Sequence, residues 1–242
     1  MTGKRFAKYW IHNGLITING QKMSKSLGNS LTVKDALKKY QPEVIKYMLM
    51  QKHYSSTVDI NDTEFLQAEK HMYYFYQTFK EIDKFLAAQI PAESGDIENN
   101  IYSEIEVKFQ EAMDDDFNTA AAYAYLFTIM KFLNTVLADK KIEASIKAKV
   151  LKDIKDKTIE LYNLLAIFEE NPKTFLNNMK NKYLEKLEIS AEEIEEKIEA
   201  RKNAKLEKNY ALADEIRNEL DVKGIVLLDT KEGTNWGIKE LQ

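Results

Sequence analysis

The chain has 242 residues, is 44% hydrophobic and carries a formal net charge of −4 at pH 7. This length can bury a core, in one large domain or in two to three small ones. The sequence has neither an apolar run of ~20 residues to span a bilayer nor a signal-peptide apolar region, which predicts a cytoplasmic protein without membrane segments. With no cysteine and three histidines at no ligand-like spacing, disulfides are excluded and no zinc site is expected in this chain.

The charge is unevenly distributed along the chain. Residues 1–58 carry ten Lys or Arg against two acids, residues 59–185 fifteen against twenty-three, and residues 186–242 ten against fourteen. Because phosphate contacts are local, the basic first segment can bind a nucleotide or RNA although the whole chain is acidic. The acidic excess of the middle segment is typical of the solvated surface of helices.

The pentapeptide KMSKS at residues 22–26 lies between Gly20 and Gly28. Lysines three residues apart can hold phosphate oxygens from two sides, and flanking glycines allow a loop to close over a nucleotide and reopen. The motif predicts a nucleotide-binding loop, with a solvated lysine loop as the alternative. Two short helices are expected after it, one over residues 30–37 and one that begins at Pro42.

Residues 59–170 have the pattern of a helical bundle. Gly95 is the one glycine between Gly28 and Gly224, and such gaps are typical of helical proteins. Apolar residues recur three and four apart in four stripes, over 65–86, 97–113, 125–136 and 142–168. Asn61 or Asp62 can cap the first helix, and Asn118 opens the third. The stripes predict an antiparallel bundle, with the aromatic residues of 72–79 in its core rather than stacked on bases.

Three acids, Asp114–Asp116, directly precede the helix that Asn118 opens. Carboxylates there favour the positive end of a helix, so we prefer a capping role over a metal or acid–base site. Further along, Asn171-Pro172 predicts a helix stop and residues 171–189 a linker.

Residues 190–242 are expected to form a separate unit. Ser190 and Glu193 fit a capping box that opens a charged helix to about residue 208, and a second helix is expected over 211–220. Gly224 ends the helical pattern, and residues 225–238 predict a β-hairpin. The predicted fold is therefore mainly α: a loop with connecting helices, an antiparallel helical bundle and a small α+β C-terminal domain.

Four stretches in order carry a family resemblance: YWIHNG at 9–14 with KMSKSLGN at 22–29, AMDDDFNT at 112–119, GIVLLDT at 224–230, and GTNW at 233–236. They resemble cysteinyl-tRNA synthetase, a class I aminoacyl-tRNA synthetase, in its C-terminal half only. The resemblance implies that residues 1–58 end the catalytic domain with the KMSKS loop and connecting helices. It implies a bundle of the anticodon-binding type at 59–170, a linker at 171–189 and an anticodon-recognition domain at 190–242.

The resemblance also implies a role for the loop. Lys25 is the first candidate for contact with the ATP phosphates, assisted by Lys22, because a positioned ammonium stabilises the charge on departing pyrophosphate. The whole pentapeptide is expected to bind ATP with its Mg²⁺: Lys22, Met23, Ser24, Lys25 and Ser26. Zinc is expected in the intact enzyme, on ligands outside this chain.

In the tail, Asp214 and Asp229 match two acids with which the family grips the anticodon. A carboxylate can accept from N1–H and the exocyclic amine of guanine. Tyr210 and Trp236 are candidates for stacking on unpaired bases, although Trp236 fits a packing role beneath the hairpin equally well. Phosphate contacts are expected from Arg201, Lys205 and Lys208. Lys205 stands where the family usually has arginine, which removes a bidentate fork at that position.

The implied function is ATP-dependent ligation of cysteine to tRNA(Cys) by a monomer, with tRNA(Cys), ATP and cysteine as partners. The chain alone is expected to be inactive, because the adenine, ribose and cysteine pockets belong to the other half of the family's enzyme. One alternative is a stand-alone tRNA-binding module without catalysis. Another is a related ligase that joins cysteine to a sugar amine, although such a ligase needs no anticodon reader.

Overall fold

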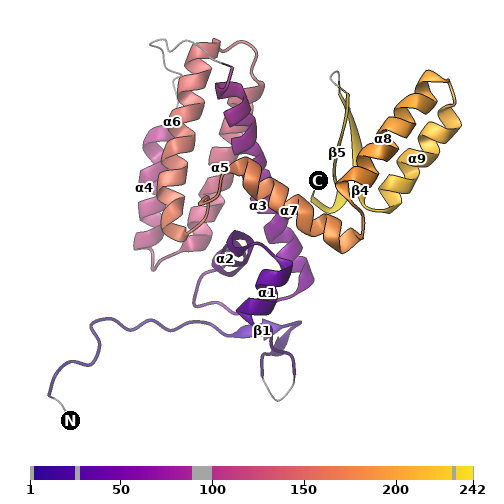
Figure 1. The fold of residues 1–242 in the computed structure, drawn as a ribbon. Helices are drawn as coiled ribbons and strands as arrows, with labels where there is room; N and C mark the ends of the chain where they lie inside the picture. The colour runs from indigo at the N-terminus through magenta and orange to yellow at the C-terminus, as the bar shows by residue number, and fades with distance from the viewer. Residues whose placement is uncertain (1–2, 25–27, 89–99, 231–232, 242) are drawn as a thin grey trace.

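The structure is a computed structural model that describes residues 3–24, 28–88, 100–230 and 233–241. Figure 1 shows three parts in chain order: a small sheet with two short helices, a helical bundle, and a tail of two helices and a hairpin. The predicted fold class is confirmed, since the described chain is mainly α with a small α+β unit at its C-terminal end.

The first part contains a three-stranded sheet of order β2–β1–β3. Its strands are β1 (Ile16–Ile18), β2 (Gln21–Lys22) and β3 (Val58–Ile60). β1 pairs antiparallel with β2 through a turn at Asn19 and Gly20, whose left-handed φ values of 51° and 74° suit asparagine and glycine. The parallel β1–β3 pairing is reached through α1 (Val33–Lys39) and α2 (Pro42–Met50). This sheet holds the start of the KMSKS loop.

Four helices form the bundle: α3 (Asp62–Leu86), α4 (Ile101–Asp114), α5 (Thr119–Ala138) and α6 (Ala144–Tyr162). Two of the predicted caps are present. The Asn61 side chain accepts from Glu64 N at 2.8 Å, and that of Asn118 accepts from Ala121 N at 3.0 Å. Both bonds satisfy a backbone N–H that has no partner inside its helix.

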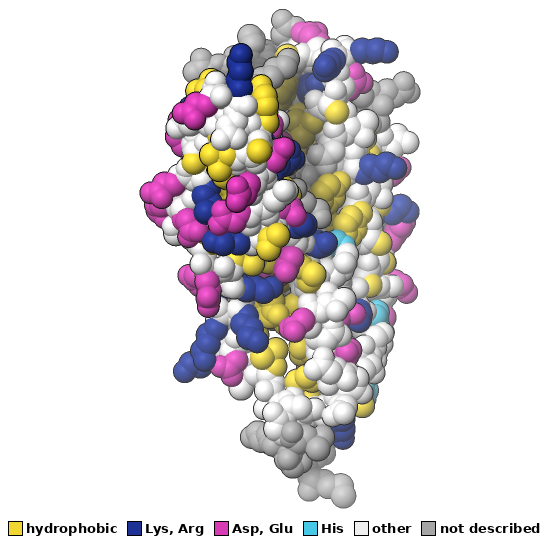
Figure 2. All heavy atoms as spheres, turned by 90° about the vertical axis from the view of Figure 1, so that its right-hand side faces the viewer, with side chains coloured by type: hydrophobic (Ala, Val, Ile, Leu, Met, Phe, Trp, Pro, Cys, Tyr) yellow, Lys and Arg dark blue, Asp and Glu magenta, His cyan; other side chains and the backbone are white. Residues whose placement is uncertain are grey.

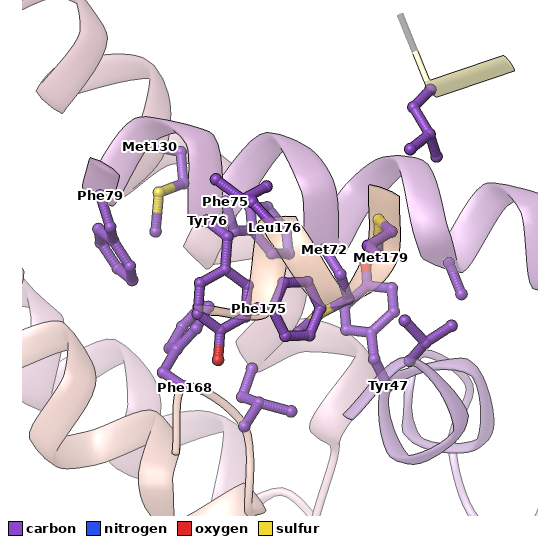
Figure 3. Close-up of a cluster of buried hydrophobic side chains, with 14 of the residues drawn as sticks. Tyr47, Met72, Phe75, Tyr76, Phe79, Met130, Phe168, Phe175, Leu176 and Met179 are labelled. Atoms are coloured by element: carbon purple, nitrogen blue, oxygen red, sulfur yellow. The ribbon is translucent and has the colours of Figure 1, made fainter. Parts of the chain in front are cut away.

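Aromatic and sulfur-containing side chains from α2, α3, α5 and α7 meet in the core (Figure 3). Phe75, Tyr76 and Phe79 are fully buried there, as their helical spacing predicts, whereas Tyr74 of the same stretch is 38% exposed. Tyr76 stacks on Phe175 of α7 with ring centroids 3.8 Å apart. Among the described helices, α5 has the length and hydropathy of a membrane span, but its apolar face is buried in this bundle.

The turn after α4 is held by the first part of the chain. Tyr54 Oη donates to Asp116 Oδ1 at 2.8 Å, and His53 Nε2 lies 3.0 Å from the Asp116 carbonyl oxygen. Asp115 accepts from the Asn118 side-chain amide at 3.0 Å. Two of the three acids therefore take part in structural contacts. Within the described residues, no group of three or more His, Asp or Glu side chains is placed to hold a metal.

The segment expected as a linker contains a packed helix. After a short 3₁₀ turn (Asn163–Leu165), α7 runs over Pro172–Leu187 with Asn171 as its N-cap. Asn171-Pro172 therefore starts a helix, and the predicted helix stop is wrong: asparagine accepts from Lys173 N, and proline fits the first turn, where its missing N–H costs nothing. Buried Phe175, Leu176, Met179, Tyr183 and Leu184 pack this helix onto the core.

The tail consists of α8 (Ala191–Leu206), α9 (Tyr210–Val222) and the antiparallel strands β4 (Ile225–Thr230) and β5 (Gly233–Ile238). Ser190 accepts from Glu193 N at 3.0 Å, as the capping box predicts. In the hairpin register, Leu227 pairs with Trp236 and Asp229 with Thr234, so these four side chains share one face of the hairpin.

A buried carboxylate ties the first part to the bundle. Glu43 of α2 is 2% exposed and accepts four hydrogen bonds: from Tyr76 Oη at 2.7 Å and from the backbone N–H groups of Phe168, Glu169 and Glu170 at 2.8, 3.0 and 3.3 Å. Burial raises the pKa of Glu43 above its ordinary value, although these four bonds pull it in the other direction. The arrangement fixes α2, α3 and the start of α7 relative to one another.

A second contact fixes the tail against α7. Lys180 Nζ lies 3.0 Å from the centroid of the Trp236 ring, and Trp236 Nε1 donates to Glu195 Oε1 of α8 at 2.8 Å. Burial lowers the pKa of Lys180 to about 8; the charge of Lys80 lowers it too, and that of Glu195 opposes the shift. The ammonium therefore remains mostly protonated at neutral pH, where it can attract the indole face.

Replacing Glu43 with alanine should lower the free energy of unfolding by about 3 kcal/mol, because three backbone N–H groups and one tyrosine hydroxyl lose their buried acceptor. Urea unfolding measures this loss. Glu169→Ala is the matched control: that carboxylate is half-exposed and pairs with Lys46, and its removal should cost under about 1 kcal/mol. Equal losses for the two variants would contradict the role given to Glu43.

The pKa of Lys180 gives a second test. The unfolded chain binds the Lys180 proton up to pH ~10.5 and the folded chain only up to about 8, so this group should make stability rise with pH between those values. In a Trp10→Phe background, Trp236 fluorescence should titrate with a midpoint near pH 8. Lys180→Met should abolish both effects, whereas the control Lys173→Met, on an exposed lysine of α7, should keep both. A Trp236 titration that persists in Lys180→Met would refute the contact.

Candidate functional site

The KMSKS loop is anchored on both sides by one asparagine. Asn29 Oδ1 accepts from Ser24 N at 3.0 Å, and Asn29 Nδ2 donates to the Lys22 carbonyl at 3.2 Å. Lys22 ends β2 with its side chain exposed, and Met23 is 37% exposed. Lys25 and Ser26 lie outside the described residues. The described ends of the loop are therefore held close together while Lys22 faces solvent.

An aspartate fixes the turn that leads into this loop. Asp59 of β3 accepts from Thr17 Oγ1 at 2.6 Å, from Gly20 N at 2.8 Å and from Asn61 Nδ2 at 2.7 Å. These bonds, led by the one from Thr17, lower the pKa of Asp59. Sequence reasoning assigned no role to Asp59, because two of its three partners, Thr17 and Gly20, lie about forty residues away. It placed Asn29 only within a motif.

In the tail, Arg201 and Asp229 form a bidentate pair between α8 and β4. The two terminal guanidinium nitrogens, Nη1 and Nη2, each lie 3.0 Å from a different oxygen of Asp229. Thr234 Oγ1 donates to Asp229 Oδ1 at 2.7 Å, and Lys205 Nζ reaches Oδ2 at 3.5 Å. The bonds from Arg201 and Thr234 hold the pKa of Asp229 far below its ordinary value. The side chain of Arg201 is only 5% exposed, so in this arrangement its terminal nitrogens face Asp229 rather than solvent.

Asp214 differs from Asp229 although both were expected at the same site. It lies exposed on α9, and within the described residues its carboxylate makes no hydrogen bond or ion pair. Its charge contributes to raising the pKa of Arg201, after the larger effect of the hydrogen bond to Asp229. The structure thus brings three of the predicted tail residues into contact, Arg201, Lys205 and Asp229, with Asp214 on the neighbouring helix α9.

The remaining tail candidates are Tyr210, Lys208 and Trp236. The first two lie at the turn between α8 and α9, and Trp236 already contacts Lys180 and Glu195. Tyr210 is 63% exposed at the start of α9, beside Lys208 in the turn between the two helices. Trp236 is half-buried, with Lys180 over its ring and Glu195 on its N–H. Acidic and basic side chains are interspersed over the face that carries the tail (Figure 2). Any RNA contact here therefore depends on individual side chains rather than on one basic field.

Comparison with known proteins identifies two family domains. Residues 1–70 match the family of tRNA synthetases class I (C) catalytic domains, and residues 108–169 match the DALR domain. A LeuRS of Agrobacterium radiobacter K84, solved as a ternary complex with tRNA and LeuAMS, aligns at 18% identity and a TM-score of 0.43. The alignment covers 66% of this chain and 22% of the LeuRS chain.

Curated relatives match almost the whole chain. The cysteine–tRNA ligase of Geotalea uraniireducens (strain Rf4) is 38% identical over 249 residues, covering 98% of this chain and 50% of the relative. The cysteine–tRNA ligases of Geobacter metallireducens and Lawsonia intracellularis are 39% and 35% identical, again over 98% of this chain and 49% and 50% of their own lengths. The chain spans about half the length of the relatives it matches. Over nearly its whole length it is therefore a homologue of cysteine–tRNA ligases, with a class I catalytic-domain segment followed by a DALR domain.

Proposed function

We propose that this chain supplies the KMSKS loop and the tRNA-binding part of a cysteine–tRNA ligase, which joins cysteine to tRNA(Cys) at the expense of ATP. The homology over 98% of the chain carries the proposal. The KMSKS loop, whose described ends are closed by Asn29, lies in the segment that matches the class I catalytic domain. The proposal includes the divisions 1–58, 59–170 and 190–242, with α7 packed between the last two, and a monomer that acts in the cytoplasm.

Two lysines act on the phosphates in this proposal. Lys22 and Lys25 contact the triphosphate, which brings its own Mg²⁺, and Ser24 and Ser26 donate hydroxyl hydrogen bonds. Activation of cysteine builds charge on the departing pyrophosphate, and a positioned ammonium stabilises that charge most in the transition state. The described residues do not fit a zinc site, and the chain has no cysteine, so no step here depends on zinc.

In the tail, Asp214 and Asp229 face the anticodon, and Tyr210 offers a stacking surface for an unpaired base. Asp214 is exposed, and its carboxylate makes no hydrogen bond or ion pair with the residues that the structure describes, which supports it as the acceptor for a base edge. Lys205 and Lys208 contact phosphates in this proposal, which their exposure supports. Trp236 serves packing in this scheme, because Lys180 and Glu195 already occupy its face and its N–H.

In an active ligase that contains this chain, Lys25→Ala should slow cysteine-dependent ATP–pyrophosphate exchange by ~10²–10³, the scale for loss of one positioned transition-state contact. Lys34→Ala, on an exposed lysine of α1, is the control and should leave exchange within about twofold of the parent. A normal exchange rate in the Lys25→Ala variant would contradict the proposed contact of Lys25 with the ATP phosphates.

Asp214→Ala should cost ~1–3 kcal/mol of discrimination between tRNA(Cys) and the same tRNA with its first anticodon base changed, since the base edge loses its acceptor. Filter binding of both RNAs measures it. Glu215→Ala, the neighbouring exposed acid on α9, should keep full discrimination. Lys208→Ala should weaken both RNAs alike and flatten the salt dependence, as loss of a phosphate contact does. Unchanged discrimination in the Asp214 variant would remove this residue from the site.

A further inference from the structure

Arg201 is buried, whereas most other charged side chains of the tail are exposed. Its side chain is 5% exposed, both terminal nitrogens bind Asp229, and its Nε is buried without a hydrogen-bond partner among the described residues. An orphaned buried N–H costs free energy, so stability alone gives a poor account of an arginine here. The fork geometry does something that a simple charge cannot: it sets the orientation of the facing carboxylate.

Asp229 is held more firmly than its exposure suggests. Its side chain is 46% exposed, yet each oxygen accepts at 3.0 Å from Arg201, and Oδ1 also accepts from Thr234 at 2.7 Å. Asp229 and Thr234 lie on one face of the hairpin, since they are register partners. The carboxylate therefore presents its exposed side to solvent in a fixed orientation and in its ionised form.

Asp214 stands near the same guanidinium from α9, exposed and without a hydrogen bond or ion pair among the described residues. Helix α9, which carries Asp214, packs against both α8 with Arg201 and β4 with Asp229. The cluster then presents one free acceptor and one oriented acceptor to the solvent side of the tail.

Resting on the proposed function, we infer that Arg201 is a positioning residue for base recognition: it orients Asp229 through its fork, and it makes no phosphate contact itself. Arg201 would therefore influence base specificity through Asp229, without contacting the base itself. A base whose edge offers two N–H donors is the chemical partner that this acceptor pair fits. Lysine at the position keeps the charge but loses the fork.

The test measures the ratio of Kd values of the full chain for two RNAs: tRNA(Cys), and the same transcript with its first anticodon base changed. Arg201→Met should reduce this ratio about tenfold while the dependence of log Kd on log salt keeps its slope, because no phosphate contact is lost. Arg201→Lys should fall between the parent and Arg201→Met. The matched control is Lys197→Met, which removes another α8 bridge, to Glu219 of α9 at 2.9 Å, and should leave the ratio unchanged.

Three results would overturn the inference. A ratio in Arg201→Met equal to that of the parent would show that Asp229 needs no positioning. Equal weakening of both RNAs with a shallower salt slope would show a phosphate contact instead. Should Arg201→Met fail to fold by circular dichroism, zero coupling between Arg201→Lys and Asp229→Asn in a double-mutant cycle on the same ratio would decide against it. A parent chain that binds RNA without discriminating would instead remove the base reading in the proposed function, before any variant is made.

Discussion

The arrangement of the whole chain depends on one buried carboxylate. Glu43 sits on α2, between the segment that carries the KMSKS loop and the bundle, and it accepts from α3 and from three successive backbone N–H groups at residues 168–170. A buried charge is tolerated only when it is fully hydrogen-bonded, so these partners are held to a single geometry. Since residues 168–170 lead into α7, and α7 carries the tail, Glu43 fixes the relation between the loop and the tail as well.

Similar contacts recur at the next joints. Glu69 of α3, 7% exposed, accepts from Tyr183 Oη of α7 at 2.7 Å, and burial raises the pKa of Glu69. In the tail, Arg201 and Asp229 join α8 to the hairpin. Apolar packing supplies most of the stability, but it is not directional, whereas each of these polar contacts admits one orientation. In the proposed function, a nucleotide is bound at one end and an RNA loop at the other, which requires a fixed distance between them.

Local signals in the sequence predicted much of this fold. The caps at Asn61, Asn118 and Ser190 and the hairpin after Gly224 depend on neighbours within a few residues, and the structure has all of them. The prediction of a linker at residues 171–189 missed α7, because several asparagines obscured an apolar stripe that begins with Phe175. Arg201 was expected at a phosphate, since sequence shows its charge but not its partner on a strand 28 residues away. Asp59 was overlooked for the same reason.

The proposed function depends on one contact, the grip of the tail on the anticodon of tRNA(Cys). Hydroxyl-radical footprinting of tRNA(Cys) bound to the chain tests that contact most directly, because it reports which nucleotides the protein covers. The account predicts protection centred on the anticodon loop that disappears when residues 190–242 are removed, with the bundle still folded by circular dichroism. Protection that avoids the anticodon loop, or that survives removal of the tail, would contradict it.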